Sequence, residues 1–173
     1  MPTIEQVAEV YPHFAGGSVP GGASGVVPAV RRDCSWGKPY AGSQLRSDDY
    51  VPAGTRRDPT RRKPDVVIIA LSFRSVRHAS DYVADSVKTH SACMLAGASD
   101  DAALTTKKLR FGLGDQRFAV TGVLVDGQAT RVTHRLLVRE GKTVTSTTVA
   151  STNGKPAAKR AVRLARLAVR TAR

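Results

Sequence analysis

Apolar positions recur at helical spacing in three parts of the chain. The first is a short segment after Thr3, and Thr3 and Gln6 have the spacing of a capping box at its start. The second is residues 76–93, which follow a capping Ser75, and the third is the C-terminal stretch 157–173. The pattern therefore predicts one helix near each end of the chain and one in its middle.

Strand-like patterns fill most of the remaining chain. The run 65–73 is apolar on both faces, which predicts a central strand. Asp126 and Gly127 form a hairpin signal between two alternating segments. The predicted strands are 30–36, 65–73, 108–113, 117–125, 129–140 and 142–151.

The order of these elements predicts an α+β fold. Consecutive hairpins imply an antiparallel sheet of about five to six strands, and we expect the helices to pack on one face of it as a two-layer sandwich. Residues 1–173 fit a single domain. Two loops interrupt the pattern: a flexible Gly-rich loop at 15–28 and a long, basic, Pro-containing loop at 37–64.

The positive charge is concentrated in two regions. The chain has 27 basic and 14 acidic residues, a net charge of +13. Residues 31–64 contain nine basic and four acidic residues, whereas 141–173 contain eight basic residues and no acid. This distribution predicts basic patches on an otherwise balanced domain, which would attract polyanions or anionic lipid.

The C-terminal stretch and the basic loop are the candidate anion-contact segments. On a helical wheel, alanines form one face of 157–173 and cations the other, which favours a helix docked through its alanine face over a membrane-surface helix. The loop has no aromatic residues beside its cations, which favours a solvated loop over a nucleic-acid site. The candidate contact residues are Arg56, Arg57, Arg61, Arg62, Lys63, Lys159, Arg163, Arg166 and Arg170.

No motif in the sequence assembles a nucleophile with a base, a metal site or a cofactor site. The spacing of the histidines and cysteines fits no metal-binding motif, and Gly112 and Gly114 lack the third glycine of a dinucleotide site. His134 falls on the apolar face of its predicted strand, which favours a core histidine with a satisfied hydrogen bond. We therefore expect no enzyme, no metal and no cofactor.

The two cysteines leave two possibilities open. Cys34 and Cys93 lie on separate elements, and their spacing is compatible with two buried thiols or with one disulfide closing a long loop. Trp36, two residues after Cys34, is expected on the same side of its strand and packed in the core.

Several features together resemble a known family. They are Cys34-Ser35-Trp36 after a glycine-rich segment, the strand 65–73, a helix ending in Cys93, the segments Gly114–Val120 and Leu136–Val149, and an Ala/Arg-rich last helix. The chain resembles actinobacterial secreted lipoproteins and the extracellular sensor domains of kinase-H-type serine/threonine kinases. The resemblance implies a Cys34–Cys93 disulfide and an extracytoplasmic location.

The expected function follows from this resemblance. It implies a non-enzymatic, extracytoplasmic binding or sensor-like domain, secreted or lipid-anchored, with an unknown ligand or protein partner. No apolar run is long enough to span a bilayer, and the first residues lack the apolar region of a signal peptide. The alternative is a cytoplasmic polyanion- or nucleic-acid-binding protein that uses the loop 56–63 and the C-terminal helix.

Overall fold

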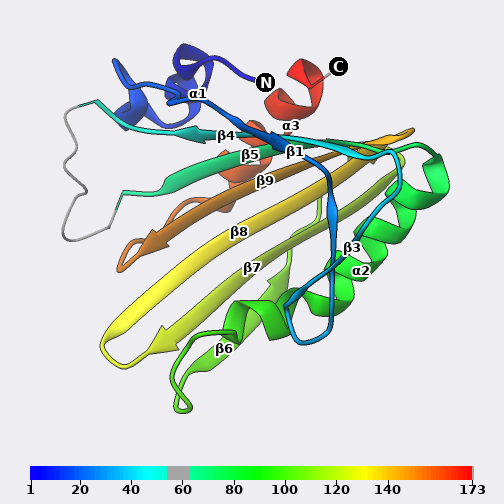
Figure 1. Cartoon of the computed structure of the whole chain (residues 1–173). Coiled ribbons are helices and arrows are strands. Elements are labelled where there is room, and N and C mark those ends of the chain that lie inside the picture. The colour runs from blue at the N-terminus through cyan, green and yellow to red at the C-terminus, as the bar shows by residue number, and fades with distance from the viewer. Residues whose placement is uncertain (54–62, 173) are drawn as a thin grey trace.

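A computed structural model describes residues 1–53 and 63–172 of the chain (Figure 1). Its helical elements are α1 (Ile4–Val10), the 3-10 helix η1 (Pro12–Phe14), α2 (Val76–Leu95) and α3 (Ala158–Thr171). Its strands are β1 (Ala23–Gly25), β2 (Pro28–Val30), β3 (Trp36–Pro39), β4 (Gln44–Tyr50), β5 (Asp65–Ser72), β6 (Ala103–Lys108), β7 (Gln116–Asp126), β8 (Ala129–Glu140) and β9 (Thr143–Thr152).

The strands form a large sheet and a small one. Seven strands are ordered β1-β4-β5-β9-β8-β7-β6, and every pair is antiparallel. β2 and β3 form a separate antiparallel hairpin. The α+β class and the antiparallel sheet are confirmed, and the sheet has more strands than the sequence pattern predicted.

Helices cover both faces of the large sheet, so the expectation of helices on one face only was wrong. One core joins α1 and α3 to Leu136 of β8, and a second core joins α2 to Leu137 of the same strand. Both leucines are 0% exposed. Because successive side chains of a strand point to opposite faces, the pair of leucines requires a cover on each side, and Figure 1 shows α2 and α3 on opposite sides of the sheet.

The segment 37–64 is not one long loop. It contains β4, which pairs along its full length with β5 and adds seven residues to the large sheet. The strand was missed because its two buried positions on one face are Asp48 and Tyr50, and an acid breaks the apolar alternation. The Nε of Arg46 lies 3.7 Å from the buried carboxylate of Asp48, and the hydroxyl of Tyr50 donates to the carbonyl of Pro2.

The Gly-rich segment 15–28 is also partly ordered into the sheet. Ala23–Gly25 forms β1 against β4, and Ser18 makes an isolated bridge with Val51. Val27 is 1% exposed in the second core. Backbone pairing, which leaves no side-chain pattern, decides this part of the structure.

The strand expected at 108–113 is displaced toward the N-terminus. β6 ends at Lys108, which pairs with Val120, and the amide of Leu109 donates the last hydrogen bond to the carbonyl of Ala119. Leu109 and Phe111 then pack against the first core. The alternation of apolar and polar residues at 108–113 therefore reflects an extended segment that is partly buried but no longer hydrogen-bonded as a strand of the sheet.

The strand expected at 30–36 is instead a hairpin, with Cys34 in its turn. Cys34 adopts a φ of 66°, and the chain returns as β3 from Trp36 onward. Trp36 is 71% exposed, so the expectation that it packs in the core was wrong. The turn, and not a continuous strand, sets the direction of its side chain.

Trp36→Ala is expected to change the free energy of unfolding by less than about 0.5 kcal/mol, because an exposed side chain loses little packing. Urea unfolding followed by far-UV circular dichroism measures this change. Trp36 is the only tryptophan, so acrylamide quenching of its fluorescence in the folded chain should approach that of the unfolded chain. A loss of several kcal/mol, or strong protection from the quencher, would contradict the exposed position.

The three predicted helices are confirmed. Thr3 and Gln6 form the capping box of α1, and the side chain of Ser75 accepts a hydrogen bond from the amide of His78 at the start of α2. Within α2, the helical repeat places Val87 on the apolar stripe, and the structure leaves it 43% exposed. The polar residues Ser86, Thr89 and His90 of α2 are buried instead.

Candidate binding groove and basic surfaces

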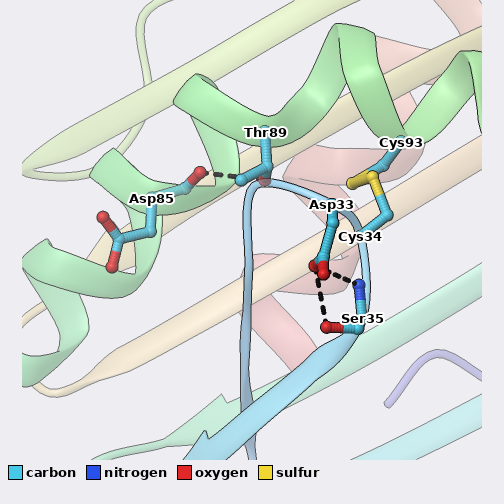
Figure 2. The surroundings of a disulfide bond; sticks show 6 residues. All are labelled: Asp33, Cys34, Ser35, Asp85, Thr89 and Cys93. Atoms are coloured by element: carbon cyan, nitrogen blue, oxygen red, sulfur yellow. Dashed lines mark hydrogen bonds between the residues drawn. A yellow bond between two sulfur atoms is a disulfide. The ribbon is translucent and has the colours of Figure 1, made fainter.

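The structure contains the disulfide Cys34–Cys93, which joins the β2–β3 turn to α2 (Figure 2). The two Cα atoms lie 5.3 Å apart, and 59 positions separate the cysteines in the sequence. Next to Cys34, the carboxylate of Asp33 accepts hydrogen bonds from the amide and the hydroxyl of Ser35, at 3.0 and 2.7 Å. These bonds and the covalent link hold the turn in a defined conformation.

Of the five candidate contact residues in the basic loop, one lies within the described residues. Arg56, Arg57, Arg61 and Arg62 lie outside the described residues, whereas Lys63 is exposed. The carbonyl of Pro64, next to Lys63, lies 3.0 Å from Nε2 of His13.

Charges from both the end of the loop and α3 act on the pKa of His13. Burial lowers the pKa of His13, and the charges of Lys63 and Arg160 lower it further. The hydrogen bond to Pro64 and the charge of Asp65 act in the opposite direction and raise the pKa of His13, so the two positive charges are partly offset there.

The basic stripe of α3 faces solvent. Lys159, Arg163, Arg166 and Arg170 are exposed. The opposite side of the helix is buried through Ala161, Leu164, Ala165, Ala168 and Val169. The docked helix with an exposed basic stripe is confirmed as a structural prediction, and whether the stripe contacts an anion stays a prediction.

A groove lies between α2 and β7, at the place where β6 ends. Its volume is about 760 Å³, larger than two other surface cavities of about 520 and 210 Å³. Its lining residues are Val87 from α2, Lys108, Leu109, Arg110, Phe111 and Gly112 from the segment after β6, and Arg117, Phe118 and Ala119 from β7. We call this site the α2–β7 groove.

Sequence reasoning missed the α2–β7 groove. Lys108 and Arg110 alternate with Leu109 and Phe111 in the strand predicted at 108–113, and Val87 falls on the apolar stripe of the helix predicted at 76–93. The signal that pointed to the site was the run Lys107-Lys108-Leu109-Arg110, in which cations and apolar residues are mixed. The displacement of β6 places this run beside Arg117.

The charge at the α2–β7 groove is positive. Lys108, Arg110 and Arg117 are exposed, and none of the described residues that line the groove is acidic. The nearest acid in sequence, Asp115, accepts hydrogen bonds from Arg139 at 3.2 Å and from the amide of Gly141 at 2.8 Å. This acid is occupied elsewhere, so the three cations keep their charge available to a ligand.

His90 lies one turn of α2 beyond Val87 and packs edge-on against Phe118, with ring centroids 5.5 Å apart. It is 4% exposed, and neither ring nitrogen finds a hydrogen-bond partner among the described residues. Burial, and after it the charge of Arg135, lower the pKa of His90 to about 4. His90 is therefore neutral in the folded protein near pH 7.

This lowered pKa predicts a loss of stability in acid. Because the unfolded pKa is about 6.5, the neutral ring favours the folded state fully above pH 6.5, and this contribution falls between pH 6.5 and pH 4. The loss reaches about 3 kcal/mol. Urea unfolding of the wild type and of His90→Leu across this range should show that the variant lacks this part of the slope. The other titratable groups are the same in both proteins and contribute equally to the pH dependence. If the free energy of unfolding of the two proteins fell in parallel with pH, the loss could not be assigned to His90.

His134 is a core histidine, as predicted. It is 3% exposed, its Nδ1 lies 2.8 Å from the hydroxyl of Thr121, and its Nε2 lies 2.7 Å from the carbonyl of Pro156. Within the described parts of the chain, no cluster of three or more histidine, cysteine or acidic side chains could hold a metal ion. Over the same residues, no helix has the length and apolar character needed to cross a membrane.

The chain matches no protein-family model, and no curated protein is significantly similar to it.

Proposed function

We propose that the chain is a non-enzymatic, extracytoplasmic binding or sensor-like domain, secreted or lipid-anchored, whose ligand site is the α2–β7 groove. The observation that carries the proposal is the disulfide Cys34–Cys93, because structural disulfides persist in oxidising compartments and are rare in the cytosol. The resemblance to extracellular sensor domains supports the same compartment.

The α2–β7 groove supports the binding part of the proposal. The groove is open to solvent, has a volume of about 760 Å³ and combines apolar walls with a few charged groups, as small-molecule sites do. The disulfide also attaches the β2–β3 hairpin to α2, the helix that supplies one wall of the groove. A rigid wall lowers the entropy cost of binding.

The test of this function is the redox state of the two cysteines in the cells that make the protein. The cells are fractionated in the presence of an alkylating reagent, and the protein is examined by mass spectrometry. We expect the protein outside the cytoplasm, with neither Cys34 nor Cys93 alkylated. A sample reduced before alkylation is the control and should carry two labels. Two alkylated cysteines without prior reduction would exclude the proposal.

A second candidate function is contact with a polyanion through α3. The observation that favours it is the exposed stripe of Lys159, Arg163, Arg166 and Arg170 on α3, which lies in a stretch, 141–173, that contains no acid. Binding of duplex DNA at 50 and 200 mM salt tests it, since phosphate contacts weaken steeply with salt. The double variant Arg163→Glu/Arg166→Glu should abolish such binding, and absence of binding by the wild type at 50 mM salt excludes this function.

A further inference from the structure

The walls of the α2–β7 groove offer an apolar surface to a ligand. Val87 of α2 is 43% exposed. Phe111, in the segment after β6, and Phe118, in β7, are half-buried. Apolar side chains that line a concave site and keep part of their surface in water favour an apolar ligand, because its binding removes that surface from water.

The same groove carries three cations with no acid to balance them. No ion pair between described residues involves Lys108, Arg110 or Arg117. Asp85 on α2 is already engaged by Lys88 and by the hydroxyl of Tyr40. The groove is therefore complementary to an anion, and a guanidinium group suits a carboxylate, sulfate or phosphate.

An apolar body and an anionic head are combined in a single-chain anionic amphiphile. We propose that the α2–β7 groove binds such a molecule, with its head at Lys108, Arg110 and Arg117 and its hydrocarbon chain against Val87, Phe111 and Phe118. This inference rests on the proposed function and adds the chemical class of the ligand to it.

The packing of the two phenylalanines favours a hydrocarbon chain over a nucleobase. Phe111 packs against the first core and Phe118 against the second, so neither ring stands free in solvent. Proteins that bind single-stranded nucleic acid use exposed aromatic rings as stacking platforms. Phe111 and Phe118 instead form part of the groove walls, against which a flexible hydrocarbon chain can pack.

The test uses laurate, a twelve-carbon carboxylate, below its critical micelle concentration and with the full, oxidised chain. Calorimetry should show saturable binding of one laurate, and amide chemical shifts should change at 108–112 and 117–119. Acetate, which has the head without the chain, should not bind. Dodecyltrimethylammonium, which has the chain with a positive head, should bind at least tenfold more weakly.

Matched variants separate the groove from the rest of the positive surface. Arg117→Gln should weaken laurate binding about tenfold, because it removes one charge-assisted hydrogen bond. Arg163→Gln, the same change on the exposed stripe of α3, should leave binding within about twofold.

A second matched pair tests the apolar wall on α2. Val87→Asp places a negative charge in the groove and should abolish binding. Val76→Asp is the control, since Val76 is 47% exposed on the same helix and does not line the groove. Both positions are exposed, so both variants should fold, and circular dichroism verifies this.

Each remaining outcome overturns the inference. Equal affinity for laurate and dodecyltrimethylammonium would show that the groove does not recognise the anionic head. Shifts confined to α3 would move the site, and absence of laurate binding at millimolar concentration would exclude the ligand class. If a single-stranded oligonucleotide bound more tightly than laurate and Arg117→Gln weakened that binding, the ligand class would be a nucleic acid and not an amphiphile. None of these outcomes changes the redox state of the cysteines, so the proposed compartment is judged separately.

Discussion

The double variant Cys34→Ala/Cys93→Ala is expected to lose about 4 kcal/mol of unfolding free energy, because the bridge closes a loop of 59 positions and restricts the unfolded chain. The disulfide is also the covalent attachment of the β2–β3 hairpin to α2. Val27, which precedes β2, belongs to the core under α2, so release of the hairpin also weakens this packing. Changing both cysteines together avoids a free thiol.

Urea unfolding in the presence and absence of reductant measures this contribution. The oxidised wild type should be more stable than the reduced wild type by about the same 4 kcal/mol, and the double variant should not respond to reductant. Cys93→Ala alone, examined in reductant, is the control for loss of the side chain. Equal stability of oxidised and reduced wild type would contradict a structural role for the bridge.

Leu164→Ala is expected to lower the free energy of unfolding by about 3 kcal/mol. Leu164 is 0% exposed in the core that joins α3, α1 and the sheet. Its neighbours on the buried face of α3, Ala161, Ala165 and Ala168, are small, and Leu164 is the largest buried side chain of this helix. Neighbours of this size cannot fill the cavity.

The adjacent Arg163→Ala provides the control. Arg163 is exposed, and its replacement should change stability by less than about 0.5 kcal/mol. Urea unfolding of both variants, with equal helix content checked by circular dichroism, measures the difference. If Leu164→Ala and Arg163→Ala were equally stable, α3 would not be docked through its alanine face.

The sequence predicted elements well wherever side chains carry the signal. The capping box of α1, the cap of α2, the doubly apolar β5 and the hairpin at Asp126-Gly127 are each set by residues within a few positions of one another. The alanine face of α3 is likewise set by the helical repeat. Local conformation and binary pattern act over short distances, so the sequence expresses them directly.

The sequence failed where backbone pairing decides the structure. β4 lies between β1 and β5 through main-chain hydrogen bonds, although its buried face holds Asp48. β6 stops at Lys108, although the apolar alternation continues beyond it. Every residue except proline offers the same amide and carbonyl, so strand partners and register leave little trace in residue type.

The α2–β7 groove likewise combines features that the sequence shows locally with features that depend on contacts between distant segments. Part of its lining, 108–111, lies in one run of mixed cations and apolar residues in the sequence. Whether this run forms a site depended on where β6 ends and on which side of the sheet α2 packs. The exposed position of Trp36 depended on the turn at Cys34. The sequence by itself determined the helices, the central strand and the charge of the surface, because these follow from local spacing and composition. Only the tertiary structure decided that both sheet faces are covered and that three cations meet apolar side chains in one groove, because these depend on contacts between distant segments.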